Sequence, residues 1–133
     1  MIEINNLTTI SANYDFLKKV AKIVLNKKKL DLSIVLVSPA KIKELNRKYR
    51  KKNTITDVLS FLYDDFGEIV ICLKKVRENA KKFGFPFKTE LARVFIHSIL
   101  HLLGYDHEKS KKQINIMEKK ENYYLNLWLK RKS

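Results

Sequence analysis

Residues 57–73, DVLSFLYDDFGEIVICL, carry the pattern on which the fold depends. Two runs rich in β-branched and aromatic residues, 57–62 and 67–73, flank a polar break at 63–66, which is typical of a β-hairpin. Upstream, apolar runs predict strands at 2–8 and 31–37. Apolar residues at helical spacing predict helices at 12–28, from Pro39 onward, and at about 74–83, 88–103 and 110–130.

The predicted order, β-α-β-α-β-β-α-α-α, indicates an α+β fold with a small mixed sheet of about four strands packed with about five helices. Ser38 before Pro39 is a helix start, and Gly84 and Gly104 are helix stops. The last helix begins at Ser110 and carries Ile114, Met117, Tyr124, Leu125 and Trp128 on one side. Because glycine and proline are few and no linker is visible, residues 1–133 are expected to form a single domain.

The chain carries 28 Lys and Arg against 14 Asp and Glu, a net charge of +14. Two interpretations stay open. Either the excess reflects a lysine-rich composition on solvated faces, or it is a positive electrostatic field that attracts an anionic partner. Cys72 is the single cysteine, which excludes an internal disulfide. No apolar run approaches the roughly 20 residues of a membrane span, and the start MIEINN lacks the features of a secretory signal. A soluble, cytoplasmic protein with no membrane partner is expected.

The basic residues fall into three blocks. Residues 41–52 hold seven and one acid, residues 74–88 hold six and one acid, and residues 109–133 hold eight and two acids. Residues 53–73, between the first two blocks, hold four acids and no Lys or Arg. This distribution predicts an apolar sheet with basic rims, where the phosphates of RNA would be held.

All three histidines lie within eleven residues, in the segment 97–107, HSILHLLGYDH. His97 and His101 are four residues apart, so they share one face of a helix. Gly104 ends that helix and allows the chain to turn, which brings His107 back towards the other two. Three imidazoles with an open fourth position are the ligands of a catalytic zinc site, predicted here at the end of a helix in the C-terminal half.

Two other interpretations of the cluster are less compatible with the spacing. One is a buried helix whose histidines only make hydrogen bonds in the core. The other is a structural zinc with four protein ligands, for which Cys72 is the available fourth ligand. A single cysteine inside the strand-like run 69–73 is more typical of a core thiol, so an open site that holds water is favoured.

The motif His97-x3-His101-x2-Gly104-x-Asp106-His107 resembles the metal motif of the YbeY-type endoribonucleases, a family of rRNA maturation factors. Segments 45–52 and 56–61 resemble that family's second signature, and 67–71 its Gly-Asp-Ile strand. The last helix, with its Met-Glu-x2-Glu run at 117–121, also resembles the family. The likeness runs from about residue 30 to the end. The sequence departs from the usual residues at four positions, none of them a metal ligand: Ile55, Leu62, Glu68 and Ser98.

The resemblance implies a single-strand-specific, zinc-dependent endoribonuclease with one Zn2+ per chain. It implies a role in maturing the 3′ end of small-subunit (16S) rRNA and in ribosome quality control. The implied partners are small-subunit rRNA, the small ribosomal subunit and its assembly factors.

Arg50 is the predicted catalytic cation, because a guanidinium grips a phosphate through two hydrogen bonds and the residue matches the family's Tyr-Arg. The other interpretation is one solvated charge among the seven in 41–52. Asp106 is expected to orient a ligand imidazole or to cap the turn. Asp57 and Ser60 match the family signature and are expected to have a structural or substrate-side role.

Two alternatives of other classes stay open. A metzincin-like metalloprotease matches the positions of the three histidines and Gly104, but its general-base Glu would stand where this chain has Ser98. A non-catalytic ribosome- or RNA-binding module with a structural zinc fits the basic blocks equally well. Tyr49, Phe61 and Tyr63 are candidates for stacking on bases, although core packing is the expected role of each.

Overall fold

The computed structural model describes residues 1–10, 12–105 and 110–132. The elements follow the predicted order: β1 (Ile2–Asn6), α1 (Phe16–Leu25), β2 (Asp31–Val37), α2 (Pro39–Arg50), β3 (Val58–Leu62), β4 (Phe66–Cys72), α3 (Leu73–Phe83), α4 (Phe87–Leu102) and α5 (Lys111–Lys132). The prediction of an α+β fold with a four-stranded mixed sheet and five helices is therefore confirmed. No described helix is long and apolar enough to cross a membrane.

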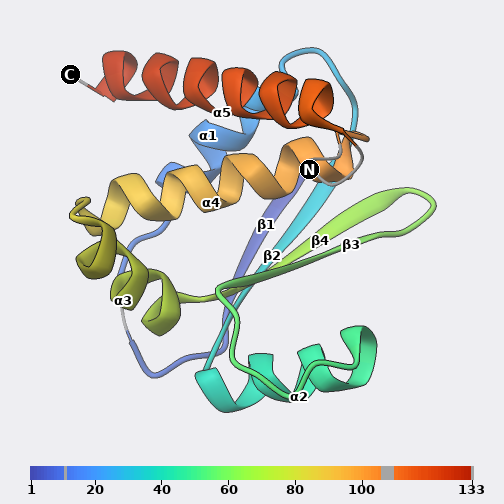
Figure 1. Cartoon of the computed structure of the whole chain (residues 1–133), viewed down its shortest axis with the longest axis vertical. Coiled ribbons are helices and arrows are strands. Elements are labelled where there is room, and N and C mark those ends of the chain that lie inside the picture. Colours follow the sequence, from blue (N-terminus) through green and yellow to red (C-terminus); the bar gives the residue numbers. More distant parts are fainter. Residues whose placement is uncertain (11, 106–109, 133) are drawn as a thin grey trace.

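The sheet has the strand order β1-β2-β4-β3, so β3 lies at one edge. Strands β1, β2 and β4 are parallel, and β3 pairs antiparallel to β4. The hairpin closes where the amide of Tyr63 donates to the carbonyl of Phe66 at 2.8 Å. Figure 1 shows α2 on one side of this sheet and α1, α4 and α5 on the other.

Strand β4 separates two hydrophobic clusters because its side chains alternate between the sheet faces. Ile69 and Ile71 belong to the large cluster that includes α1, α4 and α5. Val70 and Cys72 belong to a smaller cluster with Ile42 of α2. Cys72 is thus a core thiol, and it lies on the opposite sheet face from α4.

Helix α4 is the centre of the large cluster. It is apolar on most of its circumference, as expected of a helix that is covered on several sides. Its largest fully buried side chains are Leu91, Phe95, Ile96, Ile99 and Leu100. The surrounding elements therefore fix where its C-terminal end lies.

Local hydrogen bonds decide where the elements start and stop. Ser38 accepts from the amide of Lys41 at 3.2 Å, which confirms the predicted cap. Strand β1 stops at Asn6, two residues early, because the Asn6 side chain accepts from the amide of Thr8. The predicted helix 12–28 is shorter, since Asn13 makes the same kind of turn before α1 and Asn26 has φ 52 just after it.

Strand β4 and the end of α4 approach closely at Gly67. A Cβ on Gly67 would lie 2.7 Å from Cδ1 of Leu102 and 3.3 Å from Cδ2 of Leu32. The absence of a side chain at Gly67 therefore lets the residue next to His101 sit directly on the sheet.

We expect Gly67→Ala to lower the free energy of unfolding by about 1–3 kcal/mol, because the added methyl overpacks a buried contact. Urea denaturation measures this loss. In a Leu102→Ala background, where the clash is relieved, the same substitution should cost much less. An equal cost in both backgrounds would show that the contact with Leu102 is not the cause.

Candidate active site

A polar stripe runs down one side of α4 and consists of Glu90, Arg93, His97 and His101. Their spacing of three, four and four residues places them on one face of the helix. The exposure of their side chains increases along the stripe: Glu90 is buried, Arg93 and His97 are half-buried, and His101 is exposed. The two histidines lie at the C-terminal end of α4, where Gly104 has φ 100 and ends the helical stretch as predicted.

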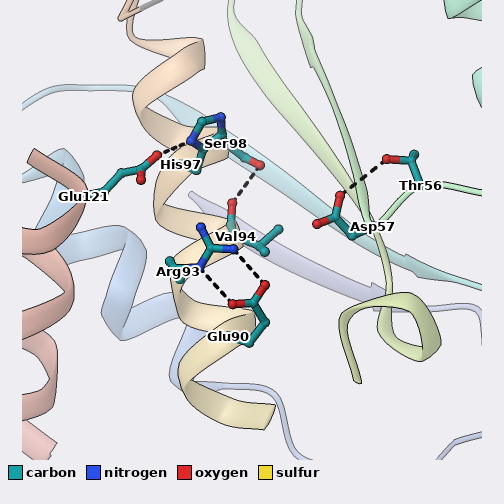
Figure 2. Close-up of polar contacts among 8 residues, drawn as sticks. All are labelled: Thr56, Asp57, Glu90, Arg93, Val94, His97, Ser98 and Glu121. Carbon is teal, nitrogen blue, oxygen red and sulfur yellow. Dashed lines mark hydrogen bonds and ion pairs between the residues drawn. The ribbon is translucent and has the colours of Figure 1, made fainter. Parts of the chain in front are cut away.

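Helix α5 supplies a carboxylate to the first histidine. Oε1 of Glu121 lies in hydrogen-bonding contact with Nδ1 of His97, and Figure 2 shows this contact bridging the two helices. A carboxylate on Nδ1 orients an imidazole and assigns Nε2 as the nitrogen for a metal. Reasoning from the sequence assigns no role to Glu121. Its spacing of four from Met117, which is buried in the core, was the available signal that Glu121 also faces inwards.

The first two residues of the stripe form a bidentate ion pair. Nε and Nη2 of Arg93 each donate to a carboxylate oxygen of Glu90 at 2.8 Å. Glu90 is 1% exposed, whereas the Arg93 side chain is 38% exposed. The hydrogen-bonded Glu90 raises the pKa of the Arg93 guanidinium against the effect of burial, and the charges of Glu121 and Asp57 act in the same direction. Arg93 is therefore a fixed cation among three carboxylates beside His97.

Arg50 is the last residue of α2 and lies next to the edge of the sheet. Its Nη2 donates to the carbonyl of Ser60 at 2.9 Å, and its guanidinium carbon lies 4.8 Å from the centre of the Phe61 ring. These contacts attach Arg50 to the edge strand β3. Because β3 is the edge strand of the sheet, a side chain from α2 reaches past it towards α4.

A pocket of about 510 Å³ brings several of the predicted residues together. Arg50, Ser60 and His101 all line it, together with Tyr49 and Tyr63. A cation from α2, an edge-strand residue and an imidazole from α4 thus share one open cavity. That combination suits a negatively charged substrate beside a metal.

Two of the aromatic residues differ from expectation. The prediction that Tyr49 and Tyr63 pack in the core is wrong: the two residues are 52% and 47% exposed. Phe61 is half-buried and packs edge-to-face against Tyr49, at 5.4 Å between ring centres. The rings are exposed because they flank the edge strand β3, beyond which the described part of the chain adds no further strand. Ile114, on the predicted apolar side of α5, is also exposed.

Asp57 lies apart from this pocket. It is half-buried just before β3, where Thr56 donates to its carboxylate at 3.4 Å (Figure 2). Its own carbonyl accepts from the amide of Cys72. Asp106 and His107 lie outside the described residues. The structure thus groups Arg50, Ser60 and His101 in one pocket that Asp57 does not line, and the charge of Asp57 acts on the pKa of Arg93.

The donors at the end of α4 fit a zinc ion. Zinc takes imidazole nitrogen readily, and the carboxylate on Nδ1 of His97 is the usual companion of a zinc-binding histidine. Within 1–10, 12–105 and 110–132 there is no group of three or more His, Cys, Asp or Glu that would complete a site. A third ligand is therefore needed from elsewhere, and Cys72 is on the wrong face of the sheet to supply it.

The residue after the first histidine does not provide a protease base. Ser98 is buried, and its hydroxyl donates to the carbonyl of Val94 at 3.0 Å (Figure 2). A hydroxyl in this position neither takes up protons near neutral pH nor faces a substrate. The metzincin-like alternative lacks its general base here.

Comparison with known proteins agrees with this geometry. The sequence model of the family described as "Endoribonuclease YbeY" matches residues 2–128. The protein of that name from Thermotoga petrophila is 46% identical over 101 residues, which are 73% of this chain and 67% of the relative. The one from Thermodesulfovibrio yellowstonii is 46% identical over 117 residues, 81% of this chain and 74% of the relative. The solution structure of TM1509 from Thermotoga maritima superposes with a TM-score of 0.75 at 37% identity, covering 98% of this chain and 91% of that one.

We expect Arg93→Met to lower the free energy of unfolding by about 2–3 kcal/mol, because it leaves the Glu90 carboxylate buried without its partner. Chemical denaturation measures the loss. Replacing both residues, as Glu90→Leu with Arg93→Met, should recover most of it. A double variant as unstable as the single one would contradict this account of the pair.

Proposed function

We propose that this chain, which belongs to the endoribonuclease YbeY family and is a hydrolase, is a zinc-dependent endoribonuclease specific for single-stranded RNA. Its proposed role is maturation of the 3′ end of small-subunit (16S) rRNA and ribosome quality control. The observation that carries the proposal is the pocket shared by Arg50, Ser60 and His101. Residues 1–133 are proposed to act as one catalytic domain.

The proposed metal ligands are His97, His101 and His107, with one Zn2+ per chain. When bound, zinc lowers the pKa of a coordinated water, which supplies a nucleophile at neutral pH. Glu121 holds the His97 ring in a single orientation, so less freedom is lost when the metal binds. Asp106 is proposed to orient a ligand imidazole in the same way.

Arg50 is proposed to neutralise the charge that develops on the phosphoryl oxygens during cleavage. Its hydrogen bond to Ser60 and its contact with Phe61 hold the guanidinium at the pocket before substrate arrives. A guanidinium has five donors, so the bond to Ser60 leaves others for a phosphate. A cation already in place costs no reorganisation when the charge appears. Ser60 and Asp57 are proposed to support this segment or to contact substrate.

The exposed tyrosines supply a reason for single-strand specificity. Tyr49 and Tyr63 flank the pocket, and an unpaired base can leave its stack and lie on such a ring. Bases in a duplex are already stacked and paired. Double-stranded RNA would therefore not make these stacking contacts and would be a poorer substrate.

The proposed partners are small-subunit rRNA, the small ribosomal subunit and its assembly factors, with action in the cytoplasm. The net charge of +14 supports an RNA partner because it favours association with phosphates. The family also supports it, since its members are described as endoribonucleases.

Cleavage of an end-labelled RNA that contains single-stranded and duplex segments tests the activity. We expect wild-type protein to cut only in the single-stranded segments and His101→Ala, purified identically, to lose the cuts. Equal cutting by both proteins would indicate a contaminating ribonuclease. No cutting by wild type on this RNA or on assembled small subunits would contradict the proposal.

We expect Arg50→Ala to reduce the rate of cleavage by about 10²–10³-fold with zinc content unchanged, as for loss of one preorganised group that stabilises the transition state. Arg47→Ala is the matched control, because Arg47 is exposed on the same helix and does not line the pocket. Single-turnover kinetics and metal analysis are the measurements. An Arg50→Ala rate close to that of Arg47→Ala would exclude the assigned role.

We expect Glu121→Gln to weaken zinc binding by about 10–100-fold, because the carboxylate that orients His97 is lost. Competition with a chromophoric chelator gives the affinity directly. Glu118→Gln, an exposed change on the same helix, should bind zinc as wild type does. Equal affinities in the two variants would mean that the contact between Glu121 and His97 does not serve the metal.

A further inference from the structure

A second pocket lies at the end of α4 opposite to His101. It has a volume of about 480 Å³ and is formed where α1, the start of α4 and the end of α5 meet. Figure 1 shows the start of α4 and the end of α5 on the same side of the molecule. Four cations line this pocket: Lys19, Lys22, Lys88 and Arg131. Among the residues that the structure describes, no acid lines it.

The floor of this pocket is aromatic. Phe16 and Trp128 stack with 5.6 Å between ring centres and an angle of 27° between planes. The ammonium of Lys88 lies 4.8 Å from the centre of the Phe16 ring, so a ring face holds one of the cations in place. The result is a concave site with an apolar base and a rim of positively charged side chains.

The positive surface continues beyond the pocket along α1. Lys22 also lines an adjoining cavity of about 740 Å³, together with Lys18, Lys28 and Lys29. That cavity contains carboxylates as well, including Asp31, which is paired with the amino group of Met1. The surface that carries only positive charge is therefore the pocket at Phe16 and Trp128.

We propose that the pocket at Phe16 and Trp128 binds the backbone of single-stranded RNA at a distance from the cleavage site. The choice of RNA as the ligand rests on the proposed function. Cations above an apolar floor match a nucleotide, which joins a phosphate to an apolar ring, and binding would release the counterions of the phosphates. A folded acidic protein offers a convex, more evenly charged surface, which fits a small cavity less well.

The distance between the two pockets sets a length for the RNA. Lys88 and His101 are thirteen residues apart on α4, which corresponds to about 20 Å at 1.5 Å per residue. That value is the rise along the helix axis and therefore a minimum for the path of the RNA, so a strand stacked at about 3.4 Å per nucleotide needs at least about six nucleotides. An RNA of about 16 nucleotides can therefore occupy both pockets, whereas one of about four cannot.

The test compares two triple variants with the same change in net charge. Lys19→Gln/Lys88→Gln/Arg131→Gln removes three cations of the pocket. Lys43→Gln/Lys74→Gln/Lys81→Gln is the control, because these three lysines are exposed on α2 and α3 and line neither pocket. Fluorescence anisotropy with a labelled single-stranded RNA of about 16 nucleotides gives the affinity over a series of salt concentrations. Gel electrophoresis confirms that the probe stays intact.

We expect the pocket variant to bind this RNA at least tenfold more weakly than the control. The slope of log affinity against log salt should become shallower by about 2, since each lost phosphate contact in a single strand contributes about 0.7. With an RNA of about four nucleotides the two variants should differ much less. Equal affinity for the longer RNA would overturn the proposal, because net charge alone would then govern binding. Binding of polyglutamate that depends on the pocket, with RNA affinity unchanged, would also overturn it.

Failure of this proposal is distinguishable from failure of the proposed function. If wild type binds RNA through the pocket but cuts none, the pocket stands and the nuclease proposal falls. If wild type cuts RNA and both variants bind RNA equally, the nuclease proposal stands and the pocket proposal falls.

If the pocket variant fails to fold, cross-linking of wild type to RNA that contains 4-thiouridine tests the pocket proposal instead. Adducts in 16–23, 88 or 128–131 are expected, and adducts confined to other surfaces would refute the proposal.

Discussion

The burial of α4 is the constraint on which the rest of the molecule depends. The helix is enclosed by the sheet, α1, α3 and α5, and its side chains supply much of the large hydrophobic cluster. A helix held on so many sides cannot rotate or slide without opening the core. Its single polar stripe is therefore held in one position. The two histidines lie at the C-terminal end of that stripe, where the neighbouring elements cover α4 less completely.

The same stripe explains how charge is tolerated inside the fold. Glu90 is buried but accepts from two donors of Arg93, and the charges of Glu121 and Asp57 also raise the pKa of Arg93. Burying one ion would be costly, whereas a hydrogen-bonded pair reduces the cost. The edge position of β3 completes the arrangement. It lets Arg50, which belongs to the layer below the sheet, share a pocket with His101, which belongs to the layer above.

Much of the fold was predictable because it follows from local patterns. The order of the elements came from hydrophobic periodicity, and the helix starts and stops came from Ser38, Gly84 and Gly104. The ends of α1 were missed because asparagine side chains compete with the helix there. The exposure of Tyr49 and Tyr63 was missed because periodicity does not reveal which strand lies at the sheet edge.

Only the part of the site whose residues are close together in the sequence was predictable. His97 and His101 stand on one turn of helix, so their spacing was informative. Glu121 is 24 residues away from His97, and only the packing of α5 on α4 brings them together. The pairing of Glu90 with Arg93 likewise depends on burial that a single sequence does not show. The proximity of Arg50 to His101 rests on a long-range arrangement of two helices around an edge strand.

Anomalous X-ray diffraction at the zinc edge, from crystals of the zinc-loaded protein, tests the central claim most directly. The account predicts one ion bound by Nε2 of His97 and by a ring nitrogen of His101 at about 2.0–2.1 Å, facing the pocket that contains Arg50. Zinc bound through Cys72, through Nδ1 of His97, or at a site away from the end of α4 would contradict it.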